Sequence, residues 1–279
     1  MKTFAAAPLA ALALVSMLAA CDRKPAEAPK APAAASPAAP PAAPARPLTF
    51  QQADPAAKVA LSLPAEIGRY PVLHTTLYDR EVAQLKDFAA KAEADRKAAD
   101  GQFPWRQYES QRQWFAAATT PKLVGLRALW FDYTGGAHPN HGGASLLWDA
   151  AANTEIKPAA LFRPDADMKA LDKAICDAVA AAKSHREGAV PLNDMFACPK
   201  WSETVLVLAP STQADKIGGL TVLIDPYVVG PYAEGDYELT IPLSAFQGLL
   251  APAYADAFAG APKSPGNPDG TLSVKMDVK

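Results

Sequence analysis

The chain has 279 residues, a formal net charge of −2 at pH 7 and an isoelectric point of about 6.1. This balance argues against a nucleic-acid partner, which would require a clustered basic face. The residues that follow the N-terminal tract are numerous enough for one large domain or two closely packed halves.

Residues 1–20 have the pattern of a bacterial export signal. Lys2 supplies a positive start, and a short apolar run of Leu, Ala, Val and Met follows up to Ala20. The run is shorter than the roughly 20 apolar residues of a membrane-spanning helix. Small residues precede Cys21, whose thiol can accept diacylglycerol. We therefore predict a lipoprotein signal peptide over residues 1–20 and a lipid anchor at Cys21; an ordinary signal peptide with a chance cysteine is the alternative.

Residues 21–48 comprise the anchor and a tract of Pro and Ala with few charges. Such a tract cannot bury enough apolar surface to offset its ordering entropy, so we expect a disordered, extended linker. At about 3.1 Å per residue, it would lift the folded part on the order of 75 Å off the membrane. We therefore expect a location in the cell envelope, facing the periplasm, with the membrane as a partner. Asp22 slightly favours the inner membrane over the outer membrane.

Two further cysteines, Cys176 and Cys198, remain once Cys21 is assigned to lipid. An even pair in an oxidising compartment most simply forms a disulfide. Two free thiols or half of a metal site are the alternatives. Neither cysteine has a CxxC partner, and no further cysteine could complete a zinc set.

Residues 49–262 are expected to form the envelope domain, with halves of about 56–163 and 164–262. A polar tail over residues 263–279 has little to pack. Strands and helices are grouped along the chain rather than strictly alternating. The pattern therefore predicts an α+β fold in which two main helices pack on antiparallel sheets.

In chain order, the first half begins with a strand over residues 58–63 and a helix over residues 78–99, whose apolar side chains recur at helical spacing. Residues 105–162 are rich in the aromatic and branched residues of strands. A glycine-rich loop over residues 135–143 interrupts them, and a return strand follows over residues 144–149.

The second half begins with a helix that Asp165 caps at its N-terminus and Gly188 ends. Its apolar stripe is expected to be buried. Three strands and a short helix follow, over residues 204–208, 220–224 and 237–243 for the strands and 244–250 for the helix.

Two segments together resemble the signatures of one family. The first is Phe131-Asp132-Tyr133-Thr134-Gly135-Gly136-Ala137-His138-Pro139-Asn140, and the second is Asp225-Pro226-Tyr227-Val228-Val229-Gly230-Pro231-Tyr232-Ala233-Glu234-Gly235. They are similar to the RsiV-type extracellular domain of lysozyme-responsive anti-sigma factors, which also occurs in many envelope lipoproteins of unknown function. Residues 59–88 resemble, more faintly, the non-catalytic module of PdaC-type peptidoglycan deacetylases.

The resemblance implies an α+β extracellular domain and, in the anti-sigma branch, binding of lysozyme. No sigma-binding segment or deacetylase domain is evident, so we expect the binding module alone on its lipid tether. The candidate binding residues lie in the two family-like segments: Tyr133, Thr134, Gly135, Gly136, His138, Asn140, Tyr227, Pro231 and Tyr232.

The loop that contains His138 and His141 has two interpretations. With Asp132 or Asp149, the histidines could bind a metal that activates water. A loop that contacts a partner, or that is structurally hydrogen-bonded, is favoured because its glycines suit a turn between strands. We expect no metal and no cofactor, and keep His138 and His141 as weak metal candidates.

Other polar and aromatic residues offer weaker signals. Ser145 lacks the glycine that a nucleophile elbow needs, so we reject a serine hydrolase. Dispersed surface acids are the simplest interpretation of the glutamates that could pair for glycan cleavage: Glu109, Glu203, Glu234 and Glu238. A second set, Tyr227, Tyr232 and Tyr237, either packs at a turn or forms an aromatic ledge for a ligand. Core positions are favoured for Trp105, Trp114, Trp130 and Trp148.

The functional hypothesis is a lipid-anchored, non-enzymatic binding module that recognises a lysozyme-like protein or a cell-wall component such as a peptidoglycan fragment. A metal-dependent envelope hydrolase built on His138 and His141 is one alternative. A structural lipoprotein that assembles other envelope parts is another.

Overall fold

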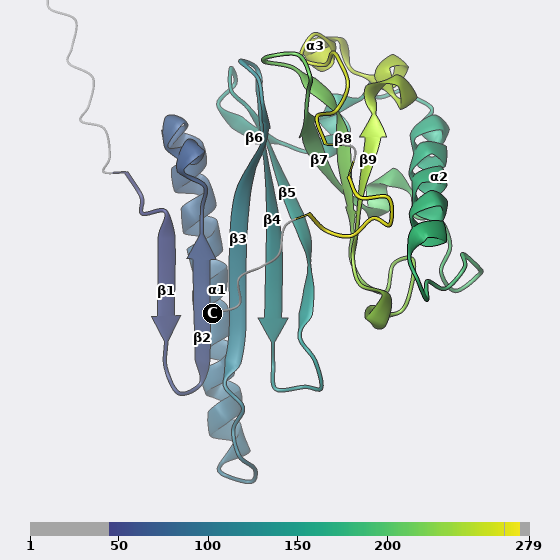
Figure 1. Cartoon of the computed structure of the whole chain (residues 1–279). Coiled ribbons are helices and arrows are strands. Elements are labelled where there is room, and N and C mark those ends of the chain that lie inside the picture. Colours follow the sequence, from purple (N-terminus) through teal and green to yellow (C-terminus); the bar gives the residue numbers. More distant parts are fainter. Residues whose placement is uncertain (1–44, 265, 274–279) are drawn as a thin grey trace, which may run out of the picture. The chain divides into compact units, whose positions relative to one another are not determined.

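The computed structural model describes residues 45–264 and 266–273 of the chain. The predicted signal peptide, Cys21 and all but the last few linker residues lie outside these ranges. The described residues belong to one unit of two sheets and two main helices (Figure 1), which is the α+β class that the sequence predicts. None of the helices in this part of the chain combines the length and apolarity that a bilayer crossing requires.

A six-stranded sheet has its strands in sequence order. The strands are β1 (Thr49–Ala53), β2 (Ala57–Ser62), β3 (Tyr108–Thr119), β4 (Leu123–Tyr133), β5 (Asn140–Asp149) and β6 (Thr154–Ile156). Neighbours pair antiparallel except β2 and β3, which are parallel. A parallel pair needs a long crossover connection, here a 3-10 turn (η1, Ala65–Arg69) and helix α1 (Pro71–Ala99). The prediction of antiparallel sheets is therefore wrong at this one pair.

Helix α1 begins seven residues earlier than the sequence predicts, because Pro71 occupies a first-turn position where its missing amide costs nothing. Its buried side chains recur on one stripe and pack against the six-stranded sheet. The stripe comprises Leu73, Leu77, Val82, Leu85, Ala89 and Ala92. Asp100, in a left-handed conformation with φ of 43°, ends the helix.

A second, antiparallel sheet has the order β7 (Val205–Pro210), β8 (Ile217–Ile224) and β9 (Tyr237–Pro242). Helix α2 (Lys169–His185) packs on this sheet through an apolar stripe of Leu171, Ile175, Val179 and Ala182. The predicted capping role of Asp165 is wrong. The Asp167 carboxylate instead accepts the amide of Lys169 at 3.2 Å, because the chain is irregular between Pro164 and the first helical turn.

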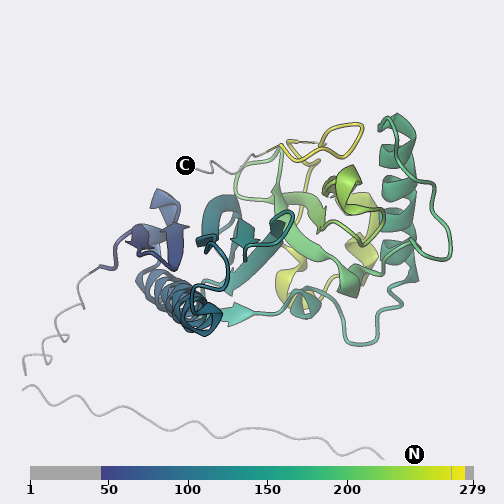
Figure 2. The same ribbon diagram turned by 90° about the horizontal axis from the view of Figure 1, so that it is seen from below.

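The two sheets face each other, so the layers run α1, six-stranded sheet, three-stranded sheet, α2 (Figure 2). Gly125 of β4 allows the close approach, since a Cβ there would lie 3.1 Å from the Leu208 side chain of β7. Arg127 and Glu238 form a buried ion pair across the interface at 3.0 Å. Cys176 and Cys198 form the predicted disulfide, which ties α2 to the segment before β7.

Two segments after β9 differ from their predictions. The expected helix over residues 244–250 is a pair of 3-10 turns, η5 (Leu243–Ala245) and η6 (Gln247–Leu249), followed by the short helix α3 (Pro252–Ala255). The expected unpacked tail is wrong for residues 266–273. The Gly270 carbonyl accepts the Glu238 amide at 2.7 Å, and Gly270 is buried. This segment thus covers the free edge of β9, which would otherwise expose unpaired backbone groups.

The remaining short elements are the 3-10 turns η2 (Pro158–Leu161), η3 (Trp201–Glu203) and η4 (Tyr232–Glu234). Trp114 and Trp148 are buried in the core on the α1 side, as predicted, whereas Trp105 and Trp130 are half-buried.

Candidate functional site

The turn between β4 and β5 spans residues 134–139, which is shorter than the predicted glycine-rich loop. Gly142 and Gly143 lie inside β5, where they pair with Trp130 and Leu129 of β4. Their role is close approach: a Cβ on Gly142 would lie 2.3 Å from the Asp225 carboxylate. The two glycines therefore allow the end of β8 to pack closely against β5. They do not serve to make a loop flexible.

Four side chains from this turn, the start of β5 and the β8–β9 connection form a continuous group that we call the aromatic ledge: His138, His141, Tyr227 and Tyr232. The Tyr232 ring is stacked on His138 with centroids 4.0 Å apart. The His141 ring lies edge-on to the Tyr232 ring, with centroids 5.4 Å apart. The Tyr227 ring is tilted relative to the Tyr232 ring, with centroids 5.7 Å apart. The structure thus brings together the two family-like segments.

Hydrogen bonds fix the ledge from both sides. The Tyr232 hydroxyl donates to the Pro139 carbonyl at 2.8 Å and lies 3.2 Å from His141 Nδ1. His141 Nε2 lies 3.1 Å from a carboxylate oxygen of Asp236. Both ring nitrogens of His141 are therefore engaged within the protein. His138 Nδ1 lies 2.9 Å from the Pro139 carbonyl oxygen.

Tyr227 is the most exposed member of the ledge, with 56% of its surface accessible. It follows Pro226 in a turn that the Val228 amide closes by donating to the Asp225 carbonyl at 3.4 Å. Its φ is 72°, a left-handed value that glycine adopts freely and a bulky side chain rarely does. The ring is thus held outward on a strained backbone.

Two carboxylates lie beneath the ledge. Asp225 accepts the Gly143 amide at 2.7 Å, and burial raises its pKa above the usual range. Burial, together with the nearby negative charge of Asp225, raises the pKa of Asp236 to about 6, against the opposing charges of His141 and Arg186. Within the described residues, the second oxygen of Asp236 is buried without a hydrogen-bond partner.

A buried polar network supports the β8–β9 connection from α2. Lys183 pairs with Glu234 and donates to the Val229 carbonyl at 2.7 Å. The Tyr237 hydroxyl also donates to Glu234, at 2.6 Å, and burial raises the pKa of Tyr237. Arg186 lies 3.7 Å over the Tyr237 ring and donates to the backbone carbonyls of Glu234, Asp236 and Asp269. The ledge therefore rests on a preorganised base.

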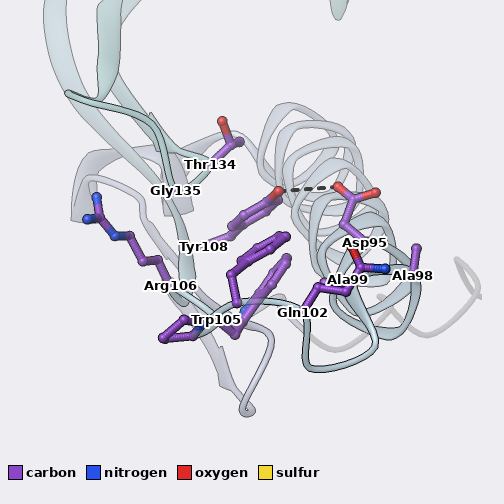
Figure 3. A pocket seen from close by; sticks show the side chains of 11 residues that line it. Asp95, Ala98, Ala99, Gln102, Trp105, Arg106, Tyr108, Thr134 and Gly135 are labelled. Atoms are coloured by element: carbon purple, nitrogen blue, oxygen red, sulfur yellow. Dashed lines mark hydrogen bonds between the residues drawn. The ribbon is translucent and has the colours of Figure 1, made fainter.

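The other predicted binding residues separate from the ledge. The Tyr133 hydroxyl lies 3.5 Å from an Arg106 nitrogen, and Thr134 and Gly135 line a pocket beside α1 (Figure 3). Asn140 pairs with Asp132 in the β4–β5 ladder, and Pro231 leads into the turn that carries Tyr232. Gly136 lies in the turn, where a Cβ would meet nothing nearer than 4.0 Å.

The aspartates weighed as metal partners do not join the histidines. Asp132 pairs with Arg112 at 2.8 Å, and Asp149, at the other end of β5, accepts the Tyr254 hydroxyl at 2.9 Å. Among the described residues, no group of three or more His, Cys, Asp or Glu side chains could hold a metal ion. Three of the four glutamates considered for glycan cleavage have structural partners instead. Glu234 pairs with Lys183, and Glu238 pairs with Arg127. Glu203 accepts the backbone amide of Lys200.

No local sequence pattern marks Asp236, Lys183 or Arg186 as parts of the site. Asp236 follows the second family-like segment directly, and its position next to Gly235 was the only available signal. Lys183 and Arg186 lie at the C-terminal end of α2, where the helix dipole alone would favour a cation. Their partners lie about fifty residues away in the chain, so no local pattern connects them.

Comparison with known proteins finds a family model that is similar to the second half of the domain. The model of a family described as a protein of unknown function (DUF3298) matches residues 159–244, which include α2, the second sheet and the β8–β9 connection. No curated protein matches the chain.

Two solved structures are similar. A DUF3298 family member from Bacteroides fragilis is 15% identical, with a TM-score of 0.52 over 75% of this chain and 95% of that one. A DUF3298 family protein from Pseudomonas aeruginosa is 20% identical, with a TM-score of 0.47 over 77% of this chain and 98% of that one. The first likeness shows a shared fold. Residues 159–244 thus match the model of the DUF3298 family, whose function is unknown, and the RsiV-type assignment stays a prediction.

Proposed function

We propose that this protein is a lipid-anchored, non-enzymatic binding module of the bacterial cell envelope. The aromatic ledge is the contact surface, and the partner is a lysozyme-like protein or a cell-wall component. The observation that carries the proposal is the exposed, strained Tyr227 held beside Tyr232.

The backbone strain at Tyr227 favours a role in binding over a role in stabilising the fold. A tyrosine at φ of 72° costs of the order of 1–3 kcal/mol compared with a relaxed residue, and its ring is more than half exposed. Such strain persists where it serves binding or catalysis. Exposed tyrosines on rigid supports are frequent anchors of protein interfaces, because they bury a large area at a small entropic cost.

The polar groups of the ledge favour binding over hydrolysis. His141 uses both ring nitrogens within the protein, and Asp225 holds a backbone amide. These groups therefore fix the geometry of the rings. The envelope location rests on the small-residue box before Cys21 and on the Cys176–Cys198 disulfide, which suits an oxidising compartment.

Titration of the full chain with lysozyme and with muropeptides tests the proposal. We expect micromolar binding of at least one ligand, and a loss of tenfold or more in Tyr227→Gly, which removes the ring and relaxes the backbone. Val72→Ala is the control, since Val72 is a 47% exposed apolar residue in the first turn of α1. Failure of every ligand at micromolar concentrations, or equal losses in the two variants, would contradict the proposal.

A further inference from the structure

A pocket of about 680 Å³ lies beside the β4–β5 turn, apart from the residues of the aromatic ledge. Its walls come from the end of α1, the connection over residues 102–106, the start of β3, and Thr134 and Gly135 of the turn (Figure 3). The volume is within the range of about 300–1,000 Å³ that is typical of small-molecule sites.

Three aromatic side chains line the pocket together with Ala98, Ala99 and Pro104. Trp105 and Tyr108 are stacked with centroids 4.7 Å apart and planes inclined by 27°. The Trp105 indole donates to the Ala56 carbonyl at 3.1 Å, and the Tyr108 hydroxyl donates to Asp95 at 3.4 Å. Phe103 is 57% exposed, so its ring is free to receive a ligand. Two rings are thus fixed and the third is accessible.

Polar side chains accompany these rings in the lining of the pocket. Asp95 and Arg106 contribute one charge of each sign, and Gln102 and Thr134 can both donate and accept hydrogen bonds. Within the described residues, the exposed side-chain amide of Gln102 makes no hydrogen bond, while the backbone amide of this residue donates to the Ala99 carbonyl at 2.8 Å. The lining as a whole therefore favours a neutral ligand with many hydroxyl or amide groups over an anion.

Gly135 keeps the turn close to the aromatic wall without filling the pocket. Its φ is 81°, and a Cβ there would lie 3.5 Å from the Tyr108 ring. Glycine adopts this backbone conformation without strain. The family-like turn therefore contributes to two separate surfaces, the ledge through His138 and the pocket through Thr134 and Gly135.

We propose that this pocket binds a neutral saccharide unit. A pyranose ring has an apolar face of C–H groups, which suits the electron-rich face of an aromatic ring, and a rim of hydroxyl groups, which suits Gln102, Asp95 and Arg106. The site does not depend on the proposed function, because a protein partner could occupy the ledge while the pocket takes a glycan.

Calorimetric titration of the full chain with the tetrasaccharide of N-acetylglucosamine tests this proposal. We expect saturable binding at millimolar concentrations or below, weakened about three- to tenfold in Phe103→Ala and in Gln102→Ala. Both residues are exposed, so the variants should fold as the parent does, which a thermal melt checks. Met195→Ala is the control, since Met195 is an 81% exposed apolar residue that belongs neither to the pocket nor to the ledge, and this variant should bind the saccharide normally.

Other outcomes would overturn the proposal. They are the absence of saturable binding at millimolar saccharide, or binding that neither pocket variant weakens. Pocket-dependent binding of a stem peptide or a nucleoside in place of the saccharide would assign the site to another ligand class. If Tyr227→Gly alone abolishes saccharide binding, the ledge is the glycan site, and the pocket proposal fails while the proposed function survives.

Discussion

At the residue scale, the backbone conformation of Tyr227 is expected to lower the stability of the fold, while its exposed ring serves binding. Its φ of 72° is relaxed only for glycine, and its ring is 56% exposed and lies 5.7 Å from the Tyr232 ring. We predict that Tyr227→Gly raises the free energy of unfolding by about 1 kcal/mol, since relief of strain exceeds the lost ring contact. Urea denaturation measures this change. A destabilised variant would show that the ring is a structural element.

The buried Asp236 predicts a pH-dependent stability. Its pKa of about 6 lies above the value of about 3.9 in an unfolded chain, so the folded state binds the proton more tightly. The stabilising contribution is therefore complete below about pH 4 and is lost as the pH rises through about 6.

We predict that Asp236→Asn, which stays neutral, gains stability relative to the parent by up to roughly 3 kcal/mol between pH 4 and pH 7. Urea denaturation at several pH values measures this difference. Asp215→Asn, at an exposed position in the β7–β8 turn, is the control. The raised pKa of Asp236 would be contradicted if the difference in unfolding free energy between Asp236→Asn and the parent were constant with pH. It would also be contradicted if the variant lost stability relative to the parent as the pH rises.

Gly142 and Gly136 provide a matched pair within one motif. A Cβ on Gly142 would lie 2.3 Å from Asp225, whereas one on Gly136 would meet nothing nearer than 4.0 Å. Overpacking typically costs about 1–3 kcal/mol. We predict that Gly142→Ala loses stability of this size and that Gly136→Ala is nearly neutral, as measured by thermal unfolding. Equal effects would show that the close approach of Asp225 to β5 does not require a glycine at position 142.

At the scale of elements, the ion pair of Arg127 in β4 with Glu238 in β9 joins the two sheets. Two bonds of 3.0 Å connect the side chains, and the Ser273 hydroxyl adds a third contact to Glu238. Burial would raise the pKa of Glu238, but the hydrogen bonds and charge of Arg127 lower it overall. Breaking such a pair leaves a buried charge without a partner.

We predict that Arg127→Met destabilises the fold by about 3–5 kcal/mol, and that the double variant Arg127→Met with Glu238→Leu recovers most of this loss. Arg46→Met is the control, because the Arg46–Asp79 pair has a similar distance of 2.9 Å but is exposed, and should cost less than about 1 kcal/mol. Denaturant titration measures all four proteins. Similar losses in Arg46→Met and Arg127→Met would refute a special role for the buried pair.

Elements with an apolar stripe could be predicted from sequence, and elements without one could not. The stripe of α2 and the apolar runs of β7, β8 and β9 are visible as patterns. Strand β1 has the sequence Thr-Phe-Gln-Gln-Ala and is mostly exposed, so its identity comes only from pairing with β2. The segment over residues 266–273 also depends on a distant partner, the free edge of β9.

At the scale of the whole molecule, both segments of the candidate site could be predicted from the sequence, but the contact between them could not. His138 and Tyr232 belong to motifs about ninety residues apart, and only the packing of the two sheets places their rings in contact. The pairings of Asp236 with His141 and of Arg186 with the β8–β9 connection arise in the same way. Local patterns contain no information about such long-range contacts.

The family match covers only one side of the ledge. It includes the connection that contains Tyr227 and Tyr232, but not the turn that contains His138. The six-stranded sheet provides that turn, so the proposed contact surface depends on both sheets. A protein with the second sheet alone would lack half of the surface.

Hydrogen–deuterium exchange on the full chain tests this central claim most directly. Exchange is compared without ligand, with saturating lysozyme and, separately, with muropeptides. We predict that residues 134–141 and 225–236 become protected together by the same ligand, while strand β1 exchanges as in the free protein. Protection of only one segment, protection elsewhere, or no protection with either ligand would contradict the account.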